Sequence, residues 1–545
     1  MIRTKVNSIF PFSIICLFLI ASSCANKLSP TGGEKDIEGP LAVRVAPKNY
    51  STNFESKKIE IAFNEFVALK DLNKQLVISP IMDPIPEITL KRKTLTIKLP
   101  DSLKRNTTYT INFGDAIVDI TESNPIVNFQ YVFSTGNYID SLYCGGKALR
   151  ASDLSTQKDI LIMLYEDLQD SIPAKQLPDY YSKTDENGLF LLNNLKAGTY
   201  RLIALKDNNN NFLYDLPEEF VGFESNFISL PDSLAHRILL SKPEPSKLKL
   251  VRSTNNAYNQ VRLIFNTSTT NLAIVDLQNN EISNVIQEFS TYRDTVQLYV
   301  TDTVPDSLKF IVRNGLNTID TVNISLGKVR SKSKGRGAAV LPFSLKNNIK
   351  SARLDYNKPI RLKSNYPIRE LDIEKFSLYK DSVKMDAPKI VADTKANILV
   401  SIDGGFTENE SYRLVILPNA IENLIYQRND TIDLKFIVKR IKEYGNLNLS
   451  FNPNPGAGNF VLLLVDDEDK TKYKLLGNSS GTYSFNYLFP GSYKIKMFLD
   501  ENNNGKLDPG NYWSNVQPER VYYYPETVKV RANWDVSISW DIELK

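Results

Sequence analysis

The stretch DENGLFLLNNLKAGTYRLIALKDNNNN, residues 185–211, decides the fold class of this chain of 545 residues. It predicts an apolar strand, a turn at KAG, a second strand, and a loop rich in Asp and Asn. Short strands separated by turn residues are typical of β structure. Elsewhere, runs such as KIEIAF and TYTINF alternate apolar and polar residues and recur roughly every 8–15 residues from residue 40 onward. Long helical periodicity is nearly absent. The chain is therefore expected to be all-β, made of tandem β-sandwich domains.

The opening stretch has a second copy near the end of the chain, NSSGTYSFNYLFPGSYKIKMFLDENNN, residues 478–504. Nine residues keep a constant offset of 293 between the copies. They are Gly188, Phe190, Leu195, Gly198, Tyr200, Asp207, Asn209, Asn211 and Asp215 in the first, and Gly481, Tyr483, Leu488, Gly491, Tyr493, Asp500, Asn502, Asn504 and Asp508 in the second. Chance does not preserve nine spacings, so the chain contains an internal duplication.

The order Gly-x-Phe, then Asn-Leu-x-x-Gly-x-Tyr, resembles the small prealbumin-like sandwiches found as carboxypeptidase regulatory domains and adhesin stalk repeats. In those modules the Gly-x-Tyr element turns the chain from one strand into the next. The resemblance implies that Gly198 and Gly491 are required because a side chain would clash there.

Residues 40–136 resemble the bacterial Ig-like domain of surface-layer proteins and of exported lipoproteins of the Bacteroidetes type. The features that carry this resemblance are Ala46-Pro47, IEIAFNEFV (59–67), LVISP (76–80), NTTYTINFGDAIVD (106–119) and the closing FQYVFSTG. It is specific for the fold and nearly silent on function. A weaker echo of Asn106 to Tyr109 occurs at Asn409 to Tyr412, and it predicts a second Ig-like domain.

These signals together predict the organisation of the whole chain. The expected segments are a lipoprotein signal peptide at 1–23, a flexible tether at 24–39, an Ig-like domain at 40–136, a prealbumin-like sandwich at 138–240, a β-sandwich of unassigned family at 245–343, a second Ig-like domain at 346–440 and a second prealbumin-like sandwich at 443–545. Domains of about 100 residues suit the size of β-sandwiches.

The N-terminus has the features of a secretory signal, with Arg3 and Lys5 before an apolar stretch from Ile9 to Ile20. Ala21-Ser22-Ser23-Cys24 resembles the bacterial lipoprotein cleavage box, which implies that Cys24 is acylated and becomes the first residue of the mature protein. No later stretch reaches the roughly 18 apolar residues needed to cross a bilayer, so the lipid would be the anchor. The expected location is the outer membrane, on its periplasmic or its cell-surface face.

Composition excludes several classes of function. The net charge of +4, from 66 basic and 62 acidic residues, does not favour nucleic acid as a partner. Zinc hydrolases, Ser-His-Asp triads and Cys-His pairs need a well-placed imidazole, and the one histidine, His236, has the alternating neighbours of a strand edge. After processing only Cys144 would remain beside the acylated Cys24, which excludes an intramolecular disulfide. Carboxylate-pair enzymes stay open, because they need only Asp or Glu.

The Asp- and Asn-rich loops resemble EF-hand calcium loops, in which oxygen ligands stand at positions 1, 3, 5, 7, 9 and 12. The candidate ligands are Asp207, Asn209, Asn211, Asp215 and Glu218 in the first copy, and Asp500, Asn502, Asn504, the Lys506 carbonyl and Asp508 in the second. Phe212 replaces the turn glycine in the first copy, and Asn511 replaces the terminal Glu in the second. Few charges predict weak, structural Ca²⁺ binding, with a dissociation constant of roughly 10⁻⁴–10⁻³ M. The alternative is a plain Asx-rich turn, since Asn and Asp bond their own backbone.

Two further stretches are candidate surfaces. GKVRSKSKGRGAA, residues 327–339, is basic and could lie against anionic lipid or lipopolysaccharide phosphates, although a solvated loop is the commoner outcome. NYWSNVQPERVYYYP, residues 511–525, is aromatic and would suit carbohydrate stacking or a protein interface. Alternating Tyr and Trp are also ordinary strand residues, and the strand is the favoured interpretation.

The expected function is that of a lipid-anchored, non-enzymatic structural or interaction protein, serving as an accessory subunit of an outer-membrane complex. Its partners would be the membrane, through the lipid, and a protein of the outer membrane or periplasm. One rival is a carbohydrate-binding lipoprotein serving glycan uptake, which predicts an exposed aromatic row with Trp513 and Tyr522. The other is a carboxylate-pair enzyme within residues 245–440.

Overall fold

The computed structural model describes residues 36–126, 129–245, 247–301, 306–326, 340–393, 396–454 and 458–544. The leader with Cys24, the tether as far as residue 35, and the basic stretch at 327–339 lie outside the described residues. The chain divides into two compact units. One holds the chain up to Tyr143 with residues 179–181 and 192–197, and the other holds the rest.

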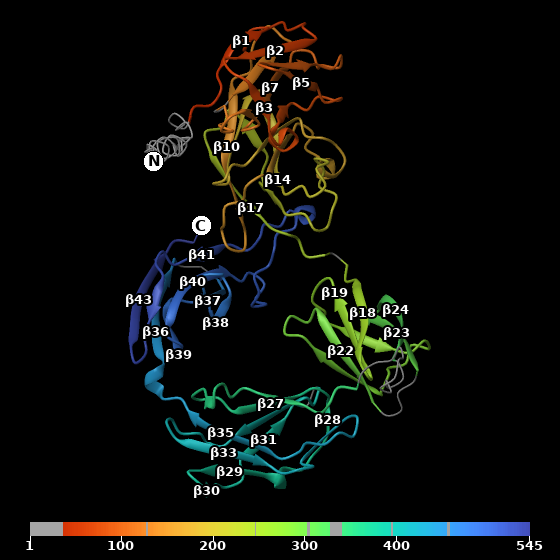
Figure 1. The fold of residues 1–545 in the computed structure, drawn as a ribbon, viewed down its shortest axis with the longest axis vertical. Helices are drawn as coiled ribbons and strands as arrows, with labels where there is room; N and C mark the ends of the chain where they lie inside the picture. Colours follow the sequence, from red (N-terminus) through yellow and green to blue (C-terminus); the bar gives the residue numbers. More distant parts are fainter. Residues whose placement is uncertain are drawn as a thin grey trace, which may run out of the picture. The chain divides into compact units, whose positions relative to one another are not determined.

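Nearly all the regular structure is β-strand, as Figure 1 shows, and the strands form tandem sandwiches, which confirms the all-β expectation. Within the part of the chain that the structure describes, the helical elements are one short helix and single turns: α2 (Leu72–Gln75), η1 (Ile172–Ala174), η2 (Ile373–Lys375), η3 (Ile441–Glu443) and η4 (Tyr512–Ser514). Within the described residues, none of these helices has the length and apolar character that crossing a membrane requires.

The first sandwich packs a four-stranded sheet, β1-β2-β6-β5, against the sheet β4-β7-β9, with β3 pairing β8. Its strands are β1 (Ala42–Ala46), β2 (Lys58–Phe63), β3 (Val67–Leu69), β4 (Val77–Ser79), β5 (Glu87–Lys91), β6 (Thr94–Lys98), β7 (Thr108–Asn112), β8 (Ile117–Asp119) and β9 (Gln130–Ser134). Alternate residues such as Ile59, Ile61 and Ile97 point inward and are fully buried, because successive side chains of a strand face opposite sides.

The first repeat module has the sheet β13-β10-β17 and the sheet β12-β11-β14-β15, to which β16 adds by pairing β14. Its strands are β10 (Leu142–Arg150), β11 (Leu161–Tyr165), β12 (Tyr180–Lys183), β13 (Leu189–Leu195), β14 (Gly198–Leu205), β15 (Val221–Phe223), β16 (Ile228–Leu230) and β17 (Ala235–Leu240). The first and last strands, β10 and β17, run parallel from Gly145↔Ala235 to Arg150↔Leu240.

The second repeat module has the same topology, with sheets β39-β36-β43 and β38-β37-β40-β41 and with β42 pairing β40. Its strands are β36 (Gly445–Pro453), β37 (Phe460–Val465), β38 (Thr471–Gly477), β39 (Gly481–Leu488), β40 (Gly491–Leu499), β41 (Val521–Tyr523), β42 (Val528–Val530) and β43 (Asp535–Ile542). β36 and β43 are again parallel. The duplication found in the sequence is therefore a duplication of a complete fold.

The glycine of the Gly-x-Tyr element is less constrained than the resemblance implies. A Cβ at Gly491 would lie 3.8 Å from the nearest atom, on the Tyr493 ring, which is ordinary contact. At Gly198 the nearest atom is the Tyr200 hydroxyl at 3.3 Å, a tighter fit. The expected clash is therefore wrong at Gly491, because a ring edge rather than main chain stands beside it.

Two more sandwiches lie between the repeats. The middle one has sheets β18-β19-β22-β21 and β20-β23-β24, and the next has β25-β27-β32-β31, β26-β35-β33-β29-β30 and the pair β28-β34. The middle strands are β18 (Leu250–Ala257), β19 (Gln260–Phe265), β20 (Leu272–Val275), β21 (Val285–Phe289), β22 (Thr295–Val300), β23 (Ser307–Asn314) and β24 (Asn317–Ser325). Those of the next are β25 (Leu345–Asn347), β26 (Arg353–Leu354), β27 (Ile360–Ser364), β28 (Ile368–Leu371), β29 (Phe376–Lys380), β30 (Val383–Lys384), β31 (Lys389–Ala392), β32 (Leu399–Asp403), β33 (Ser411–Ile416), β34 (Ile421–Asn423) and β35 (Ile432–Val438).

The weak sequence echo between the first sandwich and the one at β25–β35 has a structural counterpart. The Tyr109 hydroxyl accepts a hydrogen bond from the Lys104 backbone N–H at 2.8 Å, and the Tyr412 hydroxyl accepts one from Thr407 at 2.9 Å. Both tyrosines are buried, and each bonds five residues upstream, as in the tyrosine corner of Ig-like sandwiches. The two sandwiches therefore share a corner as well as a sheet order.

Candidate functional site

The first Asp/Asn loop follows β14 and is organised by the position-1 carboxylate. Asp207 Oδ1 accepts the backbone N–H of Asn210 at 2.7 Å, and its Oδ2 accepts that of Phe212 at 2.8 Å. Phe212, where an EF-hand loop has glycine, adopts the left-handed conformation with φ 61°. The main chain therefore wraps around Asp207 although the residue at position 6 is bulky.

The second loop follows β40 and repeats this geometry. Asp500 Oδ1 accepts the Asn504 N–H at 2.9 Å, and Oδ2 accepts the Gly505 N–H at 2.8 Å, with Gly505 at φ 70°. Asn504 Nδ2 donates to Asp508 Oδ2 at 2.7 Å, as Asn211 Nδ2 donates to Asp215 Oδ2 at 2.8 Å in the first loop. Asn502 likewise donates to Asp508, and Asn209 to Asp215.

The carboxylate that closes each loop is not the one expected from the spacing. Glu218 is exposed and lies 3.7 Å from Lys242, whereas its neighbour Glu219 is fully buried and accepts the N–H of Asn208 and of Asp215. In the second loop Glu519 accepts the N–H of Glu501 and of Asp508. In both copies the glutamate that contacts the loop is therefore one that the count of twelve positions does not reach, and Glu218 lies beside Lys242 instead.

In the second loop the reason is a seven-residue insertion. The offset between the repeats is 293 up to Asp508 and 300 from Glu519 onward, so Glu519 stands where Glu219 does. The shared pattern Glu-x-Val, in Glu219 to Val221 and Glu519 to Val521, is the sequence signal that could have found it.

The side chains of the second loop make the hydrogen bonds of an Asx-rich turn. The amide oxygens of Asn502 and Asn504 accept backbone N–H groups at 3.1 and 2.6 Å, and their NH₂ groups face Asp508. Burial raises the pKa of Glu519, and the carboxylates of Asp508 and Asp500 add to the shift. No group of three or more His, Cys, Asp or Glu side chains could hold a metal among the described residues, so a cation here would depend on amide and carbonyl oxygens.

The insertion of the second copy, residues 511–517, forms the contact between the two repeat modules. η4 begins after Asn511, whose side chain accepts the Ser514 N–H at 3.3 Å. Tyr512 is 4% exposed and packs edge-on to Phe223 at 5.3 Å and to Tyr214 at 6.0 Å. Trp513 stacks on Tyr214 at 5.5 Å with an interplanar angle of 15°. The prediction of a strand over residues 511–525 is therefore wrong at 511–517 and is confirmed only at β41 (Val521–Tyr523).

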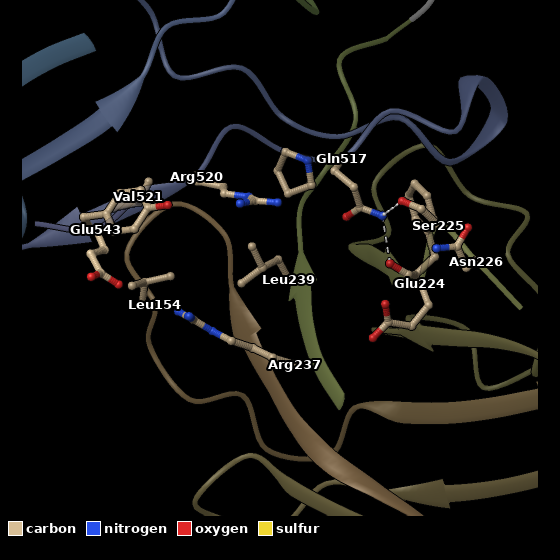
Figure 2. A pocket seen from close by; sticks show the side chains of 13 residues that line it. Leu154, Glu224, Ser225, Asn226, Arg237, Leu239, Gln517, Arg520, Val521 and Glu543 are labelled. Carbon is tan, nitrogen blue, oxygen red and sulfur yellow. Dashed lines mark hydrogen bonds between the residues drawn. The ribbon is translucent and has the colours of Figure 1, made fainter. Parts of the chain in front are cut away.

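Polar groups complete this contact. The Tyr512 hydroxyl donates to the Asp170 carbonyl at 2.9 Å, and the Gly510 N–H donates to Ser241 Oγ at 3.0 Å. Gln517 Nε2 donates to the Phe223 carbonyl at 2.9 Å and to Ser225 Oγ at 3.0 Å, as the dashed lines in Figure 2 show. Modules almost three hundred residues apart in sequence are thereby tied side by side.

Further contacts join the neighbouring sandwiches of the second unit. Between the middle sandwich and the next, Lys363 pairs with Glu288 at 2.8 Å and the Tyr366 hydroxyl donates to the Tyr258 carbonyl at 3.4 Å. Between that sandwich and the second repeat, Arg353 pairs with Glu443, and the Tyr444 hydroxyl accepts the Tyr356 N–H at 3.0 Å. The sandwiches of this unit are therefore not linked by the chain alone.

The one histidine lies on the edge strand β17, as predicted, but its side chain is buried. His236 Nδ1 is 3.2 Å from Glu224 Oε1, and Nε2 is 3.3 Å from Asp232 Oδ2. Hydrogen bonding with Cys144 and then with Glu224 raises the pKa of His236 to about 10, against the opposing effect of burial. Cys144 is a free, buried thiol. This cluster is a structural ion pair within the first repeat module.

Comparison with known proteins gives a match for the first sandwich. A model of the bacterial Ig-like domain matches residues 36–135, which agrees with the resemblance of the first sandwich. No curated protein matches the chain.

Among solved structures, the chain is similar to the Bacillus anthracis TIE protein, with 11% identity over 95% of this chain and 76% of that one and a TM-score of 0.15. It is similar to BcpA, the major pilin subunit of Bacillus cereus, with 9% identity over 74% and 99% and a TM-score of 0.15. It is also similar to the SGBP-B protein of the Bacteroides ovatus mixed-linkage glucan utilization locus, with 11% identity over 72% and 94% and a TM-score of 0.18. At these identities and TM-scores, the similarity assigns no function to this chain.

Proposed function

We propose that this protein is a lipid-anchored, non-enzymatic scaffold of the bacterial outer membrane that serves as an accessory subunit of a membrane-embedded complex. The observation that carries the proposal is the contact made by residues 511–517, where Tyr512 is buried against the first repeat module. A chain of independent binding modules has no need of such a contact. A scaffold does, because it has to hold its surfaces in fixed relation.

The membrane part of the proposal rests on the sequence. Arg3 and Lys5, the apolar stretch to Ile20 and the box ending at Cys24 are the features of an acylated export signal. The polar segment after Cys24 is long enough to act as a flexible tether. We propose that the protein is not an enzyme because its composition includes one histidine, and the imidazole of this residue pairs with Glu224 and Asp232.

The test is metabolic labelling with an alkyne fatty acid, followed by purification in mild detergent through a C-terminal tag and mass spectrometry. Incorporation of the label in the parent and its loss in Cys24→Ser are expected, together with a stoichiometric outer-membrane partner. Cys144→Ser is the matched control and should label like the parent. Labelling without any partner would reject the accessory role, and unlabelled Cys24 would reject the anchor.

For the Asp/Asn loops we propose a structural calcium ion in each copy, held by the Asp and Asn oxygens of positions 1, 3, 5 and 9. Glu219 and Glu519 brace the loops by accepting backbone N–H groups. The ion would stiffen the loop that leads into the inter-repeat contact, because Asp508 lies directly before the insertion. The ligand set has few carboxylates, which is typical of low-affinity extracellular sites.

A further inference from the structure

A pocket of about 570 Å³ lies where the β25–β35 sandwich meets the second repeat module. This volume falls within the range of about 300–1,000 Å³ that small-ligand sites occupy. Aromatic rings dominate its wall: Tyr356, Tyr444, Tyr473, Tyr487, Phe489 and Tyr493. The neighbouring positions carry polar side chains, among them Asn357 and Asn486.

The rings form one continuous cluster, part of which faces solvent. Tyr487 lies 5.2 Å from Tyr356 and 6.1 Å from Tyr444, and Phe489 lies 5.4 Å from Tyr444, measured between ring centroids. Tyr444 is 5% exposed and forms the floor, whereas Tyr487 and Phe489 keep exposed fractions of 37% and 43%. Tyr487 and Phe489 are thus partly accessible to a ligand, with the Lys439 ammonium 4.7 Å from the Phe489 ring centroid.

Tyr487 is held in this position at a conformational cost. Its φ is 57°, in the left-handed region that a bulky residue adopts only at a cost of about 1–2 kcal/mol. The equivalent residue of the first repeat is Asn194, with φ 59°, a residue type that tolerates this conformation well. Phe489 likewise corresponds to Lys196. The duplicated fold does not need these aromatics, so their presence in the second copy points to a role outside folding.

Each carboxylate around the rings is paired with a lysine, and the lining carries one further lysine, Lys358. The lining holds two carboxylates, Asp355 and Asp466, and two ammonium groups, Lys358 and Lys472. Asp466 pairs with Lys472 at 2.7 Å, and Asp355 pairs with Lys439 at 2.7 Å. A cationic ligand would have to displace a lysine from its carboxylate, and an anionic one would meet both carboxylates beside Lys358. The wall suits a neutral ligand.

We propose that this pocket binds a neutral oligosaccharide, with Tyr487 and Phe489 packed against the apolar faces of sugar rings and the asparagines and tyrosine hydroxyls bonded to sugar hydroxyls. A sugar ring has one face of C–H groups and a rim of hydroxyls, which matches flat aromatic surface bordered by amides and phenols. The site adds a ligand to the scaffold and does not depend on the proposed anchor or partner.

The experiment is isothermal titration calorimetry of the purified full chain with neutral hexasaccharides of glucose, xylose, mannose and N-acetylglucosamine. At least one is expected to bind. Tyr487→Asn, which installs the residue of the first repeat, and Phe489→Ala should each weaken that binding by about tenfold, as expected for loss of an aromatic contact of roughly 1.5 kcal/mol. Tyr292→Ala, which removes a tyrosine 78% exposed on the middle sandwich, should leave the affinity unchanged.

Four results would overturn the proposal. They are failure of every hexasaccharide to bind, unchanged affinity in both Tyr487→Asn and Phe489→Ala, tighter binding of a polyuronate hexamer than of any neutral sugar, and binding of choline without binding of sugar. Tyr487→Asn should not lower the unfolding temperature, because Asn accepts the left-handed conformation. A loss of sugar binding in this variant therefore reports on the pocket and not on the fold.

Discussion

Deleting residues 511–517 should separate the two repeat modules without unfolding either of them. The deletion joins Gly510 to Pro518 and places Glu519 four positions after Asp508, which is the spacing of Asp215 and Glu219 in the first repeat. The second Asp/Asn loop therefore takes the spacing that the first loop has. What is lost is the contact made by Tyr512, Trp513 and Gln517.

The size of the effect follows from the burial of Tyr512. A tyrosine buries about 150–250 Å² of surface. At about 25 cal/mol per Å² this is roughly 4–6 kcal/mol, an upper bound because part of the ring is covered by its own module. The hydrogen bonds of Tyr512 and Gln517 add about 1 kcal/mol each. A loss of about 4 kcal/mol changes the equilibrium between closed and open modules by roughly a thousandfold.

The assay is a distance distribution between spin labels at Ser229 and Lys529, equivalent exposed positions on β16 and β42. The parent should give a narrow distribution and the deletion a broad one. Tyr512→Ala should broaden it in the same direction, and Tyr512→Phe, which removes only the bond to the Asp170 carbonyl, should do so far less. A narrow distribution in both the deletion and Tyr512→Ala would show that this contact does not hold the modules, and the scaffold argument would fall with it.

Three other perturbations have definite expected outcomes. Calcium at about one hundred times the dissociation constant should stabilise each repeat module of the parent by about 2.7 kcal/mol in calorimetric unfolding, and Asp500→Asn with Asp508→Asn should remove the part due to the second loop; equal unfolding temperatures of the parent in calcium and in EDTA would contradict this. The pKa of His236 is raised to about 10 in the fold, above about 6.5 in the unfolded chain, so its stabilising effect is complete below about pH 6.5 and is lost as the pH rises toward 10. The first repeat, where Cys144, Glu224 and Asp232 face the ring, should accordingly lose up to about 1.4 kcal/mol per pH unit in urea unfolding over that window, and His236→Gln should flatten the slope. Gly146→Ala should destabilise the first repeat by roughly 3 kcal/mol or more, since its Cβ would lie 2.1 Å from the His236 carbonyl oxygen, whereas Gly481→Ala, with nothing within 4 Å, should be nearly neutral in the same measurement.

The β class and the duplication were accessible from the sequence because both depend on local spacing. Alternation along a strand reports which face is buried, and the constant offset from Gly188 to Asp215 reports a copied fold. The weak echo at Asn409 to Tyr412 was also informative, because the Tyr412 hydroxyl bonds within its own segment. Signals of this kind need no knowledge of what packs against them.

The closing glutamates and the inter-repeat contact were not accessible in this way. Counting twelve positions from Asp207 reaches Glu218, yet the turn at Leu216 directs the following residue, Glu219, back to the loop. The role of Tyr512 depends on a partner surface nearly three hundred residues earlier, and local alternation favoured a strand there. At Gly491 the error was of another kind. The resemblance implied that a side chain would clash there, and the packing leaves room for a Cβ.

The parallel pairing of the first and last strands in each repeat module has a mechanical consequence. In the first repeat, β10 and β17 share a continuous ladder from Gly145↔Ala235 to Arg150↔Leu240, and the chain enters at one end of it and leaves at the other. A pull along the chain would load every rung of this ladder in shear at the same moment, instead of opening the rungs one after another as in a zipper. In a protein held to a membrane at one end and to a partner at the other, tension would thus act along these parallel strands, the direction in which the ladder resists separation most strongly.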